Sequence, residues 1–143
     1  MAGEFGAAGD DVRFLHVQTT TDSRAEAIEL AHEAVKARLA ACAQVAGPVA
    51  STFWWEDGIE RAEEWLVMLK LPAERYPELA DFLIERHSYD EPEIIATPIV
   101  AGSAGYLDWI AEETAPRQPE LRWRYEFKPC WFVRAIVGNL AAA

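Results

Sequence analysis

The chain has 143 residues, a length typical of one domain, and 51% of them are hydrophobic while 26% are charged. Its formal net charge of −11 argues against nucleic acid and anionic membranes as partners, since both are themselves negatively charged. Two cysteines are too few for a disulfide framework and favour a reducing, cytoplasmic setting, and we expect neither a membrane span nor a signal peptide.

The first half of the chain predicts a strand followed by a helix. Residues 1–11 are small, Gly-rich and acidic, and are predicted to be a disordered N-terminal segment. Residues 12–19 alternate in polarity like a strand. Thr20-Thr21-Asp22-Ser23 form a turn with helix N-cap chemistry, and the acidic Glu26 follows near the helix start. Residues 25–41 then form an amphipathic helix. Its predicted apolar stripe consists of Ile28, Ala31, Val35 and Leu39.

A long hairpin is the next expected element. Residues 42–55 and 59–71 are rich in strand-forming side chains, and each predicted strand exceeds ten residues, against a mean of about five or six. Asp57-Gly58 between them predicts a type I′ turn, because both residue types accept positive φ. Gly47-Pro48 predicts a bulge or bend in the first arm.

The remaining segments continue the alternation of helix and strand. Pro72 is expected to open a second helix that runs to about Arg86, with a loop over residues 87–92. Residues 94–100 are a further apolar run, and Pro98 within it predicts an edge strand or a bulge.

These elements, with a short last helix over residues 106–113, give the order βαββαβ plus a C-terminal helix. That order predicts an α+β fold, a ferredoxin-like sandwich whose four-stranded antiparallel sheet carries helices on one face. The other face then lacks cover. Trp54, Trp55 and Trp65 on the long hairpin could cover it in another subunit.

Several motifs occur in a fixed order along residues 12–115. They are Leu39-Ala40-Ala41-Cys42, Ser51-x-Phe53-x-Trp55, Ile59 with Glu64 and Lys70, His87-Ser88-Tyr89 with Pro92-Glu93-Ile94, Pro98, and Tyr106-Leu107-x-Trp109. In these motifs the segment resembles the CutA family of divalent-cation tolerance proteins.

The resemblance implies a ferredoxin-like subunit in a tight homotrimer, in which long hairpins extend the sheets across subunit boundaries. It also implies binding of copper or another divalent metal in some members, while the biochemical activity of the family is unsettled. Three departures concern local geometry. His-Ser-Tyr at 87–89 replaces the family's His-Pro-Tyr, Lys70-Leu71 replaces Lys-Thr, and the hairpin glycine comes one place late, at Gly58.

Cys42, His87 and Glu93 are the candidate metal ligands. A thiolate suits copper(I) or zinc, and an imidazole beside carboxylates suits a divalent ion. The alternatives are a buried, inert Cys42 and a structural His87 that holds its loop by hydrogen bonds. No His-x-x-x-His or Cys-x-x-Cys spacing occurs, so any site must gather ligands from distant segments or from neighbouring subunits.

Glu64, Lys70, Tyr89 and Trp55 are the candidate residues of an inter-subunit cleft. Glu64 and Lys70 lie six residues apart on one strand and therefore share a face, where they could act as a paired acid and base. A solvated or interfacial ion pair is the alternative, and strand aromatics are more often core or interface than ligand cage. No Gly-x-Ser-x-Gly or phosphate-binding glycine pattern occurs, so we predict no catalytic residues and no enzyme.

The sequence thus predicts a cytoplasmic homotrimer that binds copper or another divalent metal weakly and serves metal tolerance. The alternative is a non-enzymatic scaffold or signalling protein that binds a protein or a small anion in clefts between subunits. Residues 116–143 form a C-terminal extension of unknown origin, native or introduced by cloning, outside the resemblance. Residues 121–128 alternate between charged and aromatic side chains like a strand, and could dock on the acidic body.

Overall fold

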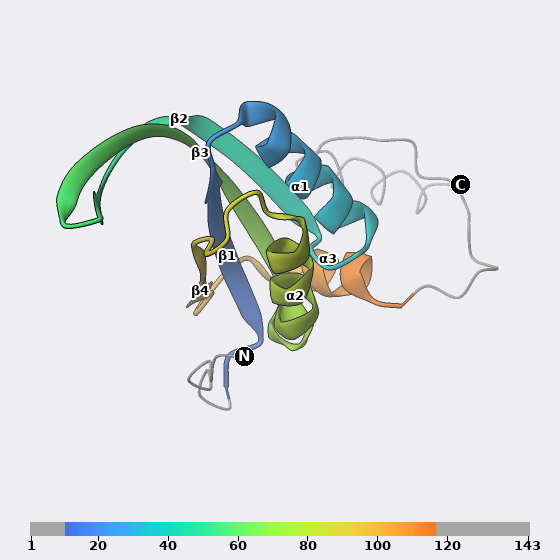
Figure 1. Cartoon of the computed structure of the whole chain (residues 1–143). Helices are drawn as coiled ribbons and strands as arrows, with labels where there is room; N and C mark the ends of the chain where they lie inside the picture. The colour runs from blue at the N-terminus through green and yellow to red at the C-terminus, as the bar shows by residue number, and fades with distance from the viewer. Residues whose placement is uncertain (1–10, 117–143) are drawn as a thin grey trace, which may run out of the picture.

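In the computed structural model, which describes residues 11–116, four strands form one antiparallel sheet in the order β2-β3-β1-β4 (Figure 1). The elements are β1 (Phe14–Thr21), α1 (Arg24–Lys36), β2 (Cys42–Trp55), β3 (Gly58–Pro72), a 3-10 turn (Ala73–Arg75), α2 (Tyr76–Arg86), β4 (Ile94–Pro98) and α3 (Ala104–Thr114). This confirms the predicted α+β, ferredoxin-like sandwich with an added last helix. The expected disordered start and the tail from residue 117 lie outside the described residues.

Helices α1 and α2 cover one face of the sheet and form the main core with it (Figure 1). Successive strand residues point to opposite faces, and the odd-numbered positions of the two central strands point to this one. Val17 of β1 and Leu69 of β3 are fully buried there, together with Leu79 and Leu83 of α2. The core of the domain therefore lies between the helices and the odd-numbered side of the sheet.

Helix α1 differs from the prediction in both its length and its buried stripe. It ends at Lys36 because Arg38 takes a left-handed conformation, with φ of 60°. The Arg38 Nη1 atom donates to the carbonyl oxygen of Glu113 in α3 at 2.7 Å, which fixes that bend. Residues Ala27, Leu30 and Ala34 are the buried side chains of the helix. Of the predicted stripe, Leu39 is buried beyond the helix end, Ala31 and Val35 pack partly buried against the core, and Ile28 is 42% exposed.

The hairpin has the predicted length, with 14 residues in β2 and 15 in β3. Its turn is placed one residue earlier than predicted. Trp55 pairs with Gly58, and the two residues between them, Glu56 and Asp57, have φ of 44° and 65°. Positive φ at both central residues is the requirement of a type I′ turn, here met without glycine.

A bulge interrupts β2 at Gly47-Pro48, as predicted, since the register with β3 shifts between Ala46 and Val49. Glycine is required at position 47 because a Cβ there would lie 2.6 Å from Cδ1 of Trp65. Pro98 lies in edge strand β4, also as predicted. Pro72, however, ends β3, so α2 begins at Tyr76.

The second face of the sheet has two distinct ends. Helix α3 covers one end, where Ile110 packs against Phe14 and Ala41. At the other end β2 and β3 continue past the sheet and curl away from it as a two-stranded arm (Figure 1). Even-numbered residues such as Gln18 and Leu66 point to this face, which therefore carries a mixture of polar and apolar side chains.

Candidate functional site

The turn between α2 and β4 is held by a buried histidine. His87 follows the last residue of α2, and its side chain is 0% exposed. Its Nδ1 atom accepts a hydrogen bond from the backbone N–H of Tyr89 at 3.0 Å. Nδ1 is therefore unprotonated, so Nε2 carries the hydrogen and donates it to the carbonyl oxygen of Thr20 at 2.8 Å.

A carboxylate from α1 holds the next residue of the same turn. The Glu26 carboxylate accepts from the backbone N–H of Ser88 at 2.9 Å and from its hydroxyl at 2.8 Å. A proline in place of Ser88 would have neither donor. The His-Ser-Tyr departure therefore adds two hydrogen bonds between the turn and α1.

Tyr89 ties the turn to the middle of β3. Its hydroxyl donates to Oε1 of Glu64 at 3.0 Å. Burial first, then this hydrogen bond and the charge of Glu64, raise the pKa of the Tyr89 hydroxyl above its usual range. The phenol therefore stays neutral and serves as a hydrogen-bond donor at physiological pH.

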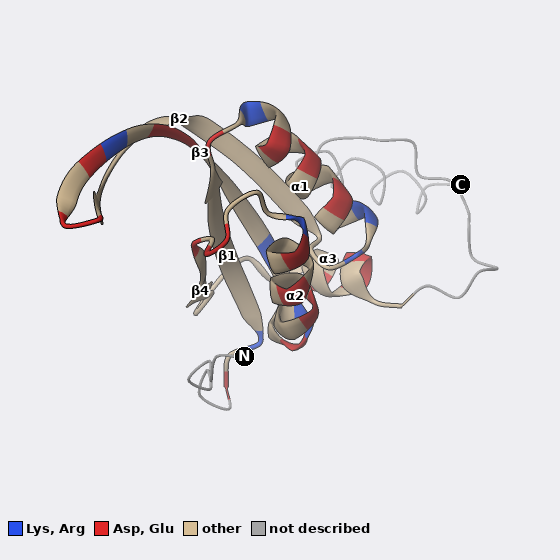
Figure 2. Cartoon of the chain, viewed as in Figure 1, with Lys and Arg blue, Asp and Glu red and all other residues tan. Residues whose placement is uncertain are grey.

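A groove of about 1130 Å³ opens between this turn and the hairpin arm. Phe53 and Trp55 of the arm and Tyr89 of the turn supply aromatic walls. The other lining side chains include five carboxylates and one guanidinium: Glu60, Glu64, Asp90, Glu91, Glu93 and Arg61. Figure 2 shows acidic residues along the arm of β3 and in the turn before β4. The groove can therefore attract cations and offer them aromatic surface.

Four of the residues singled out in the sequence line this groove: Trp55, Glu64, Tyr89 and Glu93. Lys70 does not line it. Although it shares a strand and a face with Glu64, six residues separate the two by about 20 Å. The Lys70 Nζ atom instead donates to Oε1 of Gln44 at 2.8 Å, so Glu64 and Lys70 form no acid–base pair within one protomer.

The three candidate metal ligands are not brought together within one protomer. Cys42 is half-buried and lies opposite Lys70 of β3 in the sheet. His87 is hydrogen-bonded to Thr20 of β1, which lies opposite Leu66 of β3. Lys70 and Leu66 are four residues apart along β3, so Cys42 and His87 are separated by about 13 Å along the strand direction. Within residues 11–116, no three His, Cys, Asp or Glu side chains form a group that could hold a metal ion.

Sequence reasoning missed two contributors to the site. Glu26 was assigned only to the first turn of its helix, and Phe53 only to a motif. The bond from Ser88 to Glu26 joins residues 62 positions apart, and no local pattern indicates it. The run Asp90-Glu91 beside Glu93 was the one signal in the sequence for an acidic turn.

Among residues 11–116 no helix combines the length and the apolar character required to cross a membrane.

Comparison with known proteins places this arrangement in a family. The family profile described as CutA1 divalent ion tolerance protein matches residues 15–113. The divalent-cation tolerance protein CutA of Archaeoglobus fulgidus is 38% identical over 96 residues, which are 67% of this chain and 93% of the relative.

Solved structures agree with that match. The periplasmic divalent cation tolerance protein CutA from Archaeoglobus fulgidus superposes with a TM-score of 0.69 at 36% identity, over 71% of this chain and 99% of the other. CutA1 from Oryza sativa gives 0.71 at 29% identity, over 74% and 97%. The names of the family and of the Archaeoglobus fulgidus relative describe tolerance proteins rather than enzymes.

Proposed function

This chain belongs to the CutA1 divalent ion tolerance protein family, and from that premise we propose that it is a cytoplasmic homotrimer that binds a divalent metal ion, copper first among them, and serves metal tolerance. The observation that carries the metal proposal is the groove, in which five carboxylates and a single guanidinium line the surface. The chain as a whole has a net charge of −11. Carboxylates lower the energy of a bound cation by charge and by direct coordination. The cytoplasmic setting rests on the two cysteines.

The trimer proposal rests on apolar surface that one protomer leaves uncovered. Trp54, Trp55 and Ile59 on the arm are 73%, 62% and 62% exposed, and Ile95 on edge strand β4 is 48% exposed. Burying large aromatic side chains against another subunit is favourable, and an edge strand offers unpaired backbone groups. A threefold assembly of arms and edge strands would cover both features.

The fit of the proposed ligands indicates weak metal binding. Glu93 lines the groove and can offer its carboxylate directly. His87 would have to give up one of its two hydrogen bonds, because both ring nitrogens are engaged. Cys42 lies too far from Glu93 and His87 to share an ion with them in one protomer. We propose that Cys42 joins the Glu93 and His87 of a neighbouring subunit.

Copper titration of the purified protein tests this function. Calorimetry on the wild type should give stoichiometric binding, which weakens in Glu93→Gln and Cys42→Ala. His87→Asn, which keeps a polar side chain in the turn, should weaken it as well. Glu85→Gln is the matched control, since Glu85 is exposed on α2 and lies outside the groove. Absence of heat with the wild type would remove the metal function.

The size and the aromatic walls of the groove favour one second function, a non-enzymatic scaffold that binds a protein in the cleft. The excess of carboxylates supports a basic segment as the bound group and speaks against a small anion. Under this alternative, Glu64→Gln weakens partner binding, while adding or removing copper changes nothing.

A further inference from the structure

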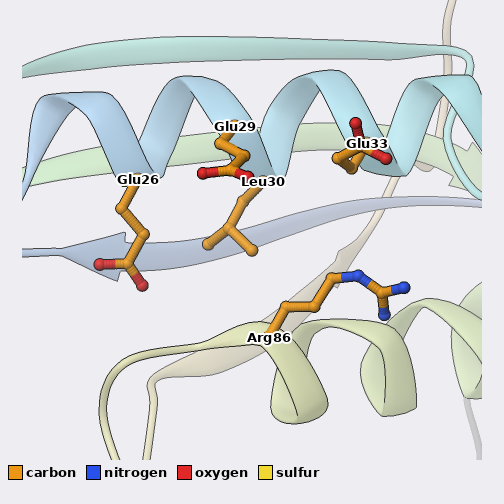
Figure 3. A pocket seen from close by; sticks show the side chains of 5 residues that line it. All are labelled: Glu26, Glu29, Leu30, Glu33 and Arg86. Carbon is orange, nitrogen blue, oxygen red and sulfur yellow. The ribbon is translucent and has the colours of Figure 1, made fainter.

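One carboxylate of α1 reaches the turn between α2 and β4 from the helix-covered side of the molecule. Glu26 lines a hollow of about 310 Å³ between α1 and α2, and it is not among the residues that line the groove. Figure 3 shows Glu26 at one end of this hollow, with its carboxylate pointing away from α1. Its contact with the turn therefore persists when another subunit covers the groove.

The contact is made at two points on a single residue of the turn. One oxygen of Glu26 accepts from the backbone N–H of Ser88 at 2.9 Å, and the other accepts from its hydroxyl at 2.8 Å. Hydrogen bonds to an ionised carboxylate are stronger than those between neutral groups. The Glu26 side chain is 19% exposed, so water competes for its oxygens only in part. The two bonds together fix both the position and the orientation of Ser88.

The backbone before Ser88 has a shape that a proline at position 88 would also allow. His87 has φ of −74° and ψ of 140°, the extended conformation to which a residue before proline is restricted. A proline ring would fix φ of residue 88 covalently, whereas serine leaves it free to rotate. We propose that the two bonds form a clamp that replaces this covalent restraint, with Glu26 as the positioning residue of the turn.

The clamp matters for metal binding, a step that rests on the proposed function. His87 must release the N–H of Tyr89 or the carbonyl oxygen of Thr20 before a ring nitrogen can bind an ion. Either release removes one of the bonds that hold the turn. The bonds from Ser88 to Glu26 do not involve the ring, so they keep the turn in place during this exchange. Copper affinity should therefore depend on a residue of α1 that does not touch the ion.

Hydrogen exchange of the Tyr89 backbone amide, followed by nuclear magnetic resonance on the metal-free full chain, tests the clamp. This N–H bonds to His87 inside the turn and not to Glu26, so it reports the order of the turn rather than the loss of its own partner. Glu26→Ala should speed its exchange about tenfold. Ser88→Ala keeps the backbone donor and should speed it about threefold. Amides in the core of β3 should keep their wild-type rates, because the opening is local.

Two variants separate the clamp from the other role of Glu26, which is also the acidic residue in the first turn of α1. Glu26→Gln loses the charge but can keep both bonds. Its amide oxygen accepts from the N–H of Ser88, and its amide nitrogen donates to the hydroxyl oxygen. The Tyr89 amide should then exchange within about twofold of the wild-type rate. Glu29→Ala removes a neighbouring carboxylate of the hollow and should leave the exchange unchanged.

A double-variant cycle decides whether Glu26 acts through Ser88. In a Ser88→Pro background the ring holds the turn, so adding Glu26→Ala should change the exchange of the Tyr89 amide by less than about twofold. Equal exchange in the wild type and in Glu26→Ala would overturn the proposal. So would an equal effect of Glu26→Ala with serine and with proline at position 88, because Glu26 would then act through α1 alone.

Calorimetry on the same preparations checks the consequence for the proposed function. Glu26→Ala should weaken copper binding about fivefold at an unchanged light-scattering mass, and adding Ser88→Pro should restore it. Unchanged copper affinity despite faster exchange would overturn the positioning role. A wild type that binds no copper would remove the metal function alone, since the exchange result still decides the clamp.

Discussion

The two faces of the sheet differ in how completely one chain covers them. On the helix-covered face, Val17, Leu69 and Leu79 are 0% exposed, so this face is finished within the protomer. On the face with the groove, Phe53 and Trp55 of the arm remain 41% and 62% exposed beside a row of carboxylates. We therefore expect the first face to supply the stability of the fold and the second to serve the proposed assembly and binding.

Shortening a side chain on each region of the same strand should separate these roles most clearly. Leu69→Ala should lower the free energy of unfolding by about 3 kcal/mol, because it opens a cavity in the core. Ile59→Ala on the exposed arm should cost below about 1 kcal/mol in a separated protomer, since little of this side chain is buried there. Urea unfolding of both variants in the Trp54→Ser, Trp55→Ser background, in which the subunits are expected to separate, measures both losses. Equal losses would show that the arm belongs to the core.

Removing aromatic surface from the arm should act on assembly instead. Trp54→Ser combined with Trp55→Ser should lower the light-scattering mass from three subunits toward one, with the far-ultraviolet circular dichroism unchanged. Ile84→Ser on the outer side of α2 is the control, because Ile84 is 53% exposed but lies away from the arm. A double variant that keeps the mass of the wild type would remove the arm from the interface.

The link between the turn and β3 should have a smaller effect, and one that depends on pH. Tyr89→Phe removes the hydrogen bond to Glu64 and should cost about 1 kcal/mol at pH 7. Because folding raises the pKa of Tyr89 above its usual value of 10.0, the folded state favours the neutral phenol. The contribution is therefore full below about pH 10 and declines as the pH rises further.

Chemical unfolding of wild type and Tyr89→Phe over this range measures the effect. The wild type should lose more stability above pH 10 than the variant does. Parallel losses would mean that Tyr89 titrates alike in the folded and unfolded states.

The smallest predicted effect is a gain of stability in the core. Within the part of the chain that the structure describes, Oγ1 of Thr19 is buried without a hydrogen-bond partner. Thr19→Val replaces this hydroxyl by a methyl group of similar size, so it should raise the free energy of unfolding by about 1 kcal/mol. Thermal unfolding checks this. A lower melting temperature would indicate that the hydroxyl has a partner in solution.

The fold could be predicted from the sequence because its signals are local. The alternation in β1, the N-cap chemistry within residues 20–23, the length of the hairpin and the bulge at Gly47-Pro48 all follow from short patterns, and all are confirmed. Three predictions failed by small shifts, and one of them is the start of α2, which is Tyr76 rather than Pro72. The turn came one residue early because Glu56 and Asp57 accept positive φ, and α1 ended early because Arg38 bends to meet α3.

The site was less accessible to sequence reasoning because it depends on distant contacts. The alternation of strand side chains correctly predicted that Glu64 and Lys70 share a face of the sheet. No sequence pattern indicates that Glu64 lines the groove while Lys70 lies outside it. Likewise, Glu26 lies in α1 and His87 follows the end of α2, and only the fold shows that both hold the turn. The metal ligands Cys42, His87 and Glu93 remain a prediction.

The central claim is that the arm and groove of one protomer are completed by other copies of the chain. Light scattering on the wild type at micromolar concentration, with the metal content of the same sample, tests it most directly. The account predicts the mass of three chains. A stable single chain under these conditions would contradict it, and every site shared between subunits would be lost with it.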